Sequence, residues 1–579
     1  MKNQLVAQIF RDIAKILEIK GDNVFRIRAY ERAAENIESL SENIDDVVRE
    51  ERIRDIAGVG KDLEGKVREI VETGKLRFFA RLKKTIPSGL LELLNIPTVG
   101  PKTAKLLYEE LKIKNIAGLE KAIQKGRLLG LFGIKEKTVE NITHGIELLK
   151  RAKERMPLPV AAQTAKEFIE ALKKLPQVKK ISTAGSLRRQ KETVRDVDIL
   201  MISDQPARVM EVFTGLKPVK EVLAEGETKS SVRTRDDVQI DCRVVRAKSF
   251  GAALLYFTGS KNFNIHLRKM AQAKGLKINE YGIFSAAGGS ASGGRKDKYI
   301  AGETEEEIFK LLGLSYIEPE MREDNGEVEL ALKNRLPALI KLSDIKGDLH
   351  VHSRYSDGSD SIRELAEAGK KRGYSYLAVT DHSQSLKVAG GLSLPELKKK
   401  KSEVDRVNAG LRNFRILFGT EVEIDSQGAI DYKDEVLKQF DVVVAAIHSG
   451  FKQSREQLTR RIVRACENKY VNIIAHLTGR LWGVRDAYDL DFERIFKAAR
   501  ETNTHLEINA FGQRLDLNDI NSRRARGAGV KLAISTDAHN SEQLEAMRLG
   551  VSVARRGWLA KGDVINTLPL AELLKVLKK

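Results

Sequence analysis

Residues 185–200 read GSLRRQKETVRDVDIL, and this stretch decides the fold of the middle of the chain. A glycine–serine turn precedes a short strand in which Asp196 and Asp198 are two positions apart. Because side chains alternate across a strand, both carboxylates project from one face and Val197 from the other. Two carboxylates so placed can bind the divalent cations of an in-line phosphoryl displacement. The stretch therefore predicts a nucleotidyl-transfer site on a strand.

A third carboxylate is needed for the cation that activates the attacking hydroxyl, and Asp241 in VQIDCRVV (238–245) is suitably placed on a later strand. Alone, an Asp-x-Asp pair is more often a solvated strand edge. The preceding glycine–serine turn and the later carboxylate together favour metal-dependent nucleotidyl transfer with Mg²⁺ or Mn²⁺.

The same stretch, followed by YFTGSKNFNIHLRKMAQAKGLKINEYGIF (256–284), closely resembles the family X DNA polymerases, which include DNA polymerase β. The resemblance runs to about residue 317 and implies a palm and a thumb after helix-rich DNA-binding regions. It departs at Gln239, where the β enzyme has an arginine beside the third aspartate. The alternative role for Arg189 is a surface ion pair. The alternative role for the aromatic rings of Tyr256 and Phe257 is packing in the core. The resemblance implies metal ligation by Asp196, Asp198 and Asp241, triphosphate contacts by Ser186 and Arg189, sugar contacts by Tyr256, Phe257 and Gly259, and base-edge and template contacts by Asn264 and Arg268.

Two glycine turns near the N-terminus, IAGVGKDLEGKV (56–67) and NIPTVGPKTAKLL (95–107), each open a helix, and GLFGIKEKTV (130–139) is a looser copy. Such turns expose backbone N–H groups that can bind a phosphate. An ordinary helix connection is the alternative, but two good copies in a basic chain favour salt-sensitive, sequence-independent DNA binding. The candidate contacts are Gly58, Gly60, Gly100 and Lys102.

Residues 1–80 also resemble the lyase domain of the β enzyme, and Lys66 aligns with its Schiff-base lysine. A nucleophilic amine is favoured by cationic neighbours. Here Asp62 and Phe78 replace lysines of the family pocket, so a DNA-phosphate contact is the stronger expectation for Lys66.

Nine histidines occur in the chain, and six of them lie in motifs of the last third, such as GDLHVHS (347–353) and TDAHN (536–540). His-x-His on a strand places both imidazoles on one face, as does Asp-x-His. A lone histidine is usually a packing or surface residue, but six in such positions indicate a metal cluster. Histidines and carboxylates together suit Zn²⁺, Mn²⁺ or Fe²⁺ better than Mg²⁺. The candidates are His350, His352, Asp357, His382, Glu421, His448, His476, Asp537 and His539.

This set resembles the PHP family (polymerase and histidinol phosphatase), which implies a distorted (β/α)7 barrel with a trinuclear Zn²⁺ or Mn²⁺ site. The implied first ion is held by His350, His352, Glu421 and Asp537. The second is held by Asp357, His382 and His539, and Glu421 bridges to a third beside His448 and His476. Asp381 and Glu423 are candidates for supporting roles, and His505 for strand packing.

Composition is consistent with these sites. The chain has 579 residues, and 101 lysines and arginines against 81 acidic residues give a formal net charge of +20. This surplus suggests a polyanionic partner. Two cysteines do not suggest a disulfide framework, and the absence of a long apolar run or a signal-peptide pattern favours a cytoplasmic, nucleoid-associated protein without a membrane partner. The expected parts are a helical lyase-like domain with a helix-hairpin-helix turn (1–80), a helical fingers-like domain with another (81–155), the palm and thumb (156–317), a linker (318–345) and the PHP domain (346–579).

The expected fold is thus multidomain, α+β and α/β. The order of polymerase and PHP domain resembles the bacterial and archaeal repair polymerases of the PolX group. This implies short gap filling in base excision repair, with gapped or primed DNA and dNTPs as partners, by a monomer. It also implies a 3′-5′ exonuclease in the barrel and, more weakly, an AP endonuclease. A small-molecule phosphoesterase delivered to DNA by the N-terminal half, and a noncatalytic scaffold, are the alternatives.

Overall fold

The computed structural model describes residues 2–38, 44–56, 58–87, 89–96, 98–285 and 298–579. The chain forms two compact units. The first comprises residues 1–153 with the segments 353–365 and 480–487, and the second comprises 154–352, 366–479 and 488–579. Within the described ranges, no helix is long and apolar enough to cross a membrane.

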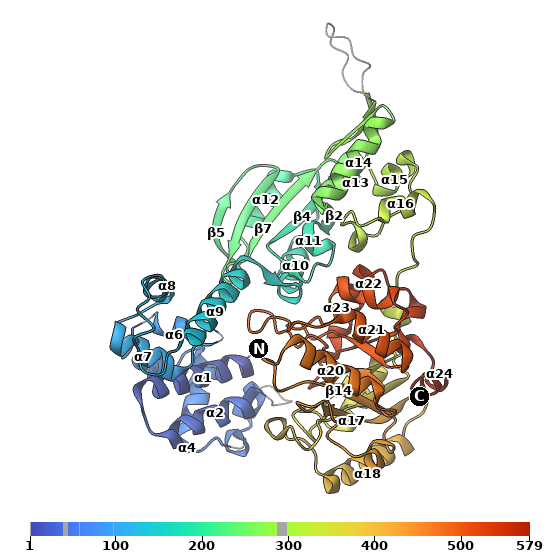
Figure 1. Cartoon of the computed structure of the whole chain (residues 1–579). Helices are drawn as coiled ribbons and strands as arrows, with labels where there is room; N and C mark the ends of the chain where they lie inside the picture. The colour runs from blue at the N-terminus through green and yellow to red at the C-terminus, as the bar shows by residue number, and fades with distance from the viewer. Residues whose placement is uncertain (1, 39–43, 57, 88, 97, 286–297) are drawn as a thin grey trace. The chain divides into compact units, whose positions relative to one another are not determined.

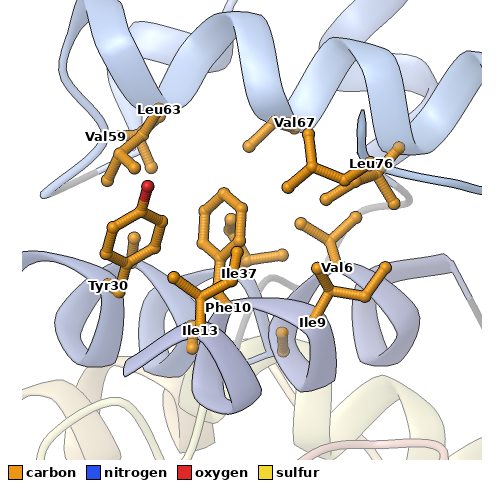
Figure 2. Packing of buried hydrophobic residues seen from close by; sticks show 14 of the residues in the cluster. Val6, Ile9, Phe10, Ile13, Tyr30, Ile37, Val59, Leu63, Val67 and Leu76 are labelled. Carbon is orange, nitrogen blue, oxygen red and sulfur yellow. The ribbon is translucent and has the colours of Figure 1, made fainter. Parts of the chain in front are cut away.

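The first unit is helical because its apolar residues recur every three or four positions. Figure 2 shows the core where side chains of α1 and α2, including Phe10 and Tyr30, point toward Leu63 and Val67 of α4. The rings of Phe10 and Tyr30 meet edge to face, with their centroids 5.4 Å apart. The helices are α1 (Lys2–Lys20), α2 (Val24–Glu38), α3 (Ile44–Arg49), η1 (Ile53–Asp55), α4 (Lys61–Thr73), α5 (Arg77–Lys83), α6 (Leu90–Leu93), α7 (Pro101–Leu111), α8 (Ile116–Gln124) and α9 (Glu136–Glu154).

The second unit begins with a five-stranded sheet in the order β2-β4-β7-β6-β5, the green part of Figure 1. The neighbours β4 and β7 are parallel, and the other pairs are antiparallel. Phe168 of α10 packs on Phe213 of α12, with ring centroids 5.8 Å apart. The elements are β1 (Met156–Pro157), α10 (Leu158–Leu172), β2 (Val178–Thr183), α11 (Gly185–Arg188), β3 (Thr193–Val194), β4 (Asp196–Ser203), α12 (Pro206–Thr214), β5 (Val219–Ala224), β6 (Lys229–Thr234) and β7 (Gln239–Val245).

A helical region with a three-stranded antiparallel sheet follows. The Gly/Ser-rich stretch SAAGGSASGGRKDK (285–298) is typical of a hairpin tip, and its residues 286–297 lie outside the described part of the chain. The expected linker 318–345 packs on this region, because Met321, Val328 and Ala331 are buried in one cluster with Phe263 and Phe309. The elements are η2 (Ala247–Ser249), α13 (Phe250–Thr258), α14 (Lys261–Ala273), β8 (Leu276–Asn279), β9 (Gly282–Ser285), β10 (Lys298–Ala301), α15 (Glu305–Leu312), η3 (Pro319–Met321), α16 (Glu327–Leu332) and η4 (Leu342–Asp344).

Seven parallel strands, β11 to β17 in chain order, form the last sheet. The sheet closes on itself, since His352 N donates to Ala538 O (2.8 Å) and Asp537 N donates to His350 O (3.0 Å). The expected distorted (β/α)7 barrel is therefore present. The strands are β11 (Gly347–Val351), β12 (Tyr376–Val379), β13 (Arg415–Glu423), β14 (Val442–Ala446), β15 (Ile473–Ile474), β16 (His505–Asn509) and β17 (Leu532–Ser535).

Helices connect these strands, as parallel pairing requires, and α17, α18 and α20 among them are labelled in Figure 1. Their bounds are α17 (Ile362–Lys371), η5 (Lys387–Ala389), α18 (Leu394–Ala409), α19 (Asp434–Leu437), α20 (Arg455–Glu467), α21 (Phe492–Glu501), α22 (Asp519–Gly527), η6 (Gln543–Ala546), α23 (Met547–Arg556), η7 (Lys561–Asp563), η8 (Ile565–Thr567) and α24 (Leu570–Val576).

Candidate nucleotidyl-transfer and metal sites

The three aspartates of the first candidate site lie on the neighbouring strands β4 and β7. Their register pairs Asp198 with Asp241 directly, and Asp196 with Gln239. All three carboxylates are on the half-buried face, whereas Val197 is fully buried on the other. The strand alternation therefore brings the predicted carboxylates together as the sequence indicated.

Burial and charge both act on Asp198. Burial, together with the neighbouring carboxylates of Asp196 and Asp241, raises its pKa to about 7, and Arg243 and Arg189 oppose the shift. Divalent cations stabilise several carboxylates that lie together and are partly buried. Their oxygen atoms are ligands that suit Mg²⁺ or Mn²⁺. The residues therefore fit the metal ions that the sequence implied.

Gln239 occupies the position where an arginine was expected from the resemblance. Its Nε2 donates to Oδ1 of Asp241 over 3.2 Å. It thus orients the third carboxylate through a neutral hydrogen bond and adds no charge.

The glycine–serine turn contacts this site through Gly185, which begins α11 with φ +61°. A Cβ atom built there would lie 2.2 Å from Oδ2 of Asp198. Glycine therefore permits both the left-handed backbone and the close approach to Asp198.

Arg189, the second expected triphosphate contact, is paired inside the molecule. Its Nε donates to Oε1 of Glu323 (3.0 Å), and its Nη1 donates to the carbonyl oxygen of Thr258. A Cβ atom on Gly259 would lie 3.2 Å from Nη1. The surface ion pair considered from the sequence is thus a largely buried one, next to the YFTGS motif.

The remaining expected nucleotide contacts lie where α13 meets α14. The rings of Tyr256 and Phe257 meet edge to face at 5.2 Å, and Tyr256 is 37% exposed. Asn264 Nδ2 donates to Tyr256 O (2.7 Å), and Arg268 Nε donates to Asn264 O (3.3 Å). The structure therefore brings these four residues together, with one aromatic face accessible.

The second candidate site is centred on Glu421 of β13, whose carboxylate is 1% exposed. Oε2 lies 2.9 Å from His382 Nδ1, 3.4 Å from His350 Nε2 and 3.6 Å from His352 Nε2. Oε1 lies 3.0 Å from His476 Nε2 and 3.3 Å from His448 Nε2. Five of the predicted histidines thus converge on one predicted carboxylate.

Asp537 and His539 complete the described part of this cluster. Asp537 Oδ1 lies 3.2 Å from His352 Nε2, and His350 Nε2 lies 3.1 Å from His352 Nε2. Ligand atoms of His350, His352 and Asp537 lie within 4.8 Å of one another, as do those of His352, His382 and His539 and those of His382, Glu421 and His448. Buried imidazole nitrogens that face one another at hydrogen-bond distance fit shared cations, and this mixture of nitrogen and oxygen donors suits Zn²⁺ or Mn²⁺.

Carboxylates behind the histidines hold their rings in place. His350 Nδ1 lies 2.8 Å from Oε1 of Glu507, and His448 Nδ1 lies 2.8 Å from Oε2 of Glu423. Such partners fix the tautomer and the ring orientation of a metal-binding histidine. Asn509 Nδ2 donates to both Glu507 and Asp537 over 3.1 Å. Glu507 and Asn509 were missed from the sequence, although the alternating polar residues of THLEINA (504–510) were a signal.

The pKa shifts of the half-buried His448 and the buried His476 differ in direction. Burial opposes a charge on His448, but Glu421 and Glu423 outweigh it and raise the pKa to about 9. For His476, burial together with Arg514 lowers the pKa to about 3, although Glu421 opposes the shift. The pKa shifts of these two imidazoles therefore have opposite directions, although both lie beside Glu421.

Two other residues singled out from the sequence, Asp381 and His505, lie outside the cluster. Asp381 is buried and pairs with Lys400 at 2.8 Å, so its role is structural. His505 is buried in β16. Asp357 is exposed on the segment 353–365 of the first unit, and its membership of the cluster stays a prediction.

In the first unit, both glycine turns open helices as expected. Gly58 has φ +82°, and Gly60 and Gly100 are the N-caps of α4 and α7. Lys102 is exposed in the first turn of α7. These backbone N–H groups are thus available at two helix N-termini.

Lys66 lies beside an acid. Its Nζ is 2.5 Å from Oδ2 of Asp62, and 5.3 Å from the ring centroid of Phe78. The side chain is 14% exposed. Lys66 is therefore part of an internal ion pair, and its role as a phosphate contact or as a lyase nucleophile stays a prediction.

Comparison with known families agrees with this organisation. Residues 1–76 match a helix-hairpin-helix domain, and 90–147 match a SAM-like helix-hairpin-helix tandem. Residues 253–323 match the DNA polymerase beta thumb, and 348–511 match the PHP domain. The fold and the two sites therefore define a family X polymerase region joined to a PHP domain.

Among known proteins, the chain is 40% identical to the DNA polymerase/3′-5′ exonuclease PolX of Bacillus subtilis (strain 168), over 100% of both chains. It is 26% identical to DNA polymerase lambda of Rattus norvegicus over 54% of each. It is also 30% identical to a probable phosphatase of Thermoanaerobacter sp. (strain X514), over 38% of this chain and 89% of the relative. The chain belongs to the PolX family of DNA polymerases and 3′-5′ exonucleases.

Proposed function

We propose that this chain extends DNA primers at Asp196, Asp198 and Asp241 and hydrolyses DNA 3′ ends at the histidine cluster of the barrel. The observation that carries the proposal is that one compact unit holds both a carboxylate set on paired strands and a separate histidine–carboxylate set around Glu421. Membership of the PolX family supports the pairing of the two activities.

At the polymerase site, the three aspartates would hold Mg²⁺ or Mn²⁺, which supplies charge neutralisation and activation of the primer hydroxyl. Ser186 and Arg189 bind the triphosphate of a dNTP, and Asn264 and Arg268 lie on the base and template side. Gly259 and the rings of Tyr256 and Phe257 bind the sugar and exclude a 2′-hydroxyl. Gln239 keeps the carboxylate of Asp241 oriented.

At the barrel site, bound Zn²⁺ or Mn²⁺ would supply Lewis-acid activation of water and of a phosphodiester oxygen. We assign His350, His352, Glu421 and Asp537 to one ion. Asp357, His382 and His539 are assigned to a second, and His448 and His476 to a third that shares Glu421. Glu507 and Glu423 hold the rings of His350 and His448 so that each Nε2 points toward Glu421.

The biological role that follows is short gap filling in base excision repair, on gapped or primed DNA with dNTPs, by a monomer in the cytoplasm at the nucleoid. The helix-hairpin-helix turns at Gly58, Gly60, Gly100 and Lys102 bind the DNA backbone, and we assign Lys66 to the same task. Cleavage at abasic sites by the barrel is a weaker extension. Salt-dependent binding to gapped DNA without sequence preference tests these assignments.

A primer–template assay tests the two chemistries. With dNTPs the labelled primer lengthens, and without them it shortens from its 3′ end. Primers that shorten from the 5′ end, or that never lengthen in either Mg²⁺ or Mn²⁺, would contradict the proposal.

A second candidate for the barrel is a small-molecule phosphatase, which the similarity to a probable phosphatase favours. Hydrolysis of a sugar phosphate by the chain, with no release of nucleotides from DNA ends, would support it.

A further inference from the structure

The inference concerns Arg189, the palm residue assigned above to the triphosphate, and it rests on that proposed function. The guanidinium of Arg189 has hydrogen-bond donors that its internal contacts do not use. Its Nε and Nη1 are used by Glu323 and Thr258, but within the described residues its Nη2 has no hydrogen-bond partner. The guanidinium is therefore held in place by two of its nitrogens and remains able to donate from the third.

The residue that holds this arrangement comes from the barrel. Arg556, the last residue of α23, donates through Nη1 to the carbonyl oxygen of Arg189 (2.8 Å) and to Oε1 of Glu323 (3.1 Å). Oε1 of Glu323 thus accepts hydrogen bonds from both arginines. Arg556 therefore contacts the backbone of Arg189 directly and the side chain of Arg189 through Glu323. All three residues belong to the second unit.

Arg556 is itself fixed. Its Nε and Nη2 lie 2.8 and 2.6 Å from Oδ2 of Asp519, which begins α22, and its side chain is 5% exposed. Charge-assisted bonds on both edges of a buried guanidinium leave it little freedom. Burial opposes the charge of Glu323, but Arg189, Arg556 and Lys191 outweigh it and hold the pKa of this carboxyl below its ordinary value.

A second contact supports the same turn. Ser552, one helical turn before Arg556 on α23, donates to Oε1 of Gln190 over 3.0 Å. Gln190 has φ +54°, a left-handed conformation that a residue other than glycine rarely adopts. The turn that carries Arg189 is therefore contacted by the barrel at two successive residues.

We propose that Arg556 and Glu323 are positioning residues of the polymerase site, through which α23 of the barrel fixes the guanidinium of Arg189 for the incoming triphosphate. The barrel then contributes to dNTP binding independently of its own hydrolytic site. Loss of Arg556 leaves Glu323 with fewer donors and frees the Arg189 turn, so dNTP binding weakens although no substrate contact has been removed.

The chain offers a matched control. Arg555 precedes Arg556 on the same helix, and it binds Glu320 (2.7 Å) and the carbonyl oxygen of Ile340 (3.1 Å). Arg555 thus also joins α23 to the segment 318–345, but its hydrogen bonds go to neither Arg189 nor Glu323. Arg555→Ala removes an ion pair of similar burial without touching the Arg189 turn.

The test is steady-state primer extension by the full chain, with KM for dNTP and kcat measured separately. Because displacement of a positioned group by a fraction of an ångström to an ångström can cost up to about 100-fold, we expect Arg556→Ala to raise KM for dNTP about 10-fold or more. Glu323→Gln is expected to do the same, with the double variant no worse than either single one. Arg556→Lys restores part of the effect, and the exonuclease rate shows that each barrel is folded.

Arg555→Ala is expected to leave KM for dNTP within about twofold of the parent. An equal rise of KM for dNTP in Arg555→Ala and Arg556→Ala, or an unchanged KM in a folded Arg556→Ala, overturns the inference. Arg189→Ala separates this failure from that of the proposed function. If Arg189→Ala also leaves KM unchanged, the triphosphate assignment is wrong, whereas a raised KM in Arg189→Ala alone rejects only the coupling to the barrel.

Discussion

Gly185 and Asp198 lie so close together that a single added carbon would displace the carboxylate: a Cβ atom on Gly185 would be 2.2 Å from Oδ2 of Asp198. The turn before the strand and the aspartate on the strand are therefore one structural feature. This relationship explains why a glycine must precede the serine of the site.

Gly185→Ala is expected to reduce primer extension by about 100-fold, because the new methyl group displaces Asp198 and the left-handed backbone is strained. Gly215→Ala in the same region is the control, since Gly215 ends α12 with φ −87° and its added carbon would meet a carbonyl oxygen at 3.3 Å. Single-turnover extension measures both. Equal losses in the two variants would argue against a specific contact with Asp198.

Glu421→Gln is expected to remove bound metal and to abolish hydrolysis, because five histidines converge on this carboxylate. Primer extension should stay within about twofold, since the aspartate site is separate. Elemental analysis of the dialysed protein and shortening of a labelled primer measure the two effects. Full metal content in Glu421→Gln would contradict the role of Glu421 as the shared ligand.

The residues behind the histidines should have a milder effect. Glu507→Gln is expected to slow hydrolysis by about 10- to 100-fold, because a neutral amide orients His350 less well and lowers its basicity. The loss should be partly restored by excess Mn²⁺, which a direct catalytic role of Glu507 does not predict. Titration of hydrolysis rate against metal concentration distinguishes the two.

A buried ion pair in the thumb predicts acid sensitivity. Glu305 is 4% exposed and pairs with Arg188 and Arg322, each at 2.6 Å. Burial opposes its charge, but the two arginines outweigh it and lower its pKa to about 2. A carboxyl whose folded pKa is below its unfolded value of about 4.5 stabilises the fold above pH 4.5, and this stability is lost as the pH falls from 4.5 toward 2.

At neutral pH, Glu305→Gln is expected to cost about 3 kcal/mol, since it leaves the buried Arg322 and the half-buried Arg188 without their carboxylate. Its unfolding should also depend less on pH between 4.5 and 3 than that of the parent. Urea unfolding followed by tryptophan fluorescence measures this, because Trp558 packs in the same cluster as the thumb. The exposed neighbour Glu306 gives the control Glu306→Gln. A parent protein as stable at pH 3 as at pH 7 would be evidence against the pair.

Lys66 is expected to bind DNA rather than to react with it. Borohydride should trap no covalent complex between the chain and abasic DNA, because the side chain of Lys66 is only 14% exposed and its Nζ is paired with Asp62. Lys66→Ala should weaken binding to gapped DNA and lower the salt slope by about one. Lys75→Ala, at an exposed lysine beyond the end of α4, is the control. A trapped complex that Lys66→Ala abolishes would restore the lyase assignment.

Much of both sites could be predicted because their residues follow strand periodicity. Asp196 and Asp198 share a face by alternation, and the histidines follow buried strands whose ends meet in a closed barrel. The pairing of Asp198 with Asp241 depends on the register of two strands that are more than thirty residues apart, which no local pattern specifies.

Other features could not be predicted because they depend on tertiary contacts. The sequence around 318–345 is acidic and rich in turns, which favoured a linker, but Met321, Val328 and Ala331 are buried against the thumb. Glu323 in this segment is held by arginines from two distant parts of the chain. The half-buried position of Glu323 depends on these tertiary contacts, which no local pattern specifies.

Paired substitutions in one assay test the central claim, that two separate sites in one chain lengthen and shorten DNA. A 5′-labelled primer on a template is incubated with and without dNTPs, using folded Asp196→Ala plus Asp198→Ala in one reaction and folded His352→Ala in the other. We predict that the aspartate variant shortens the primer and never lengthens it, and that His352→Ala lengthens it and never shortens it. If either variant loses both activities while its fold is intact, the account of two independent sites is contradicted.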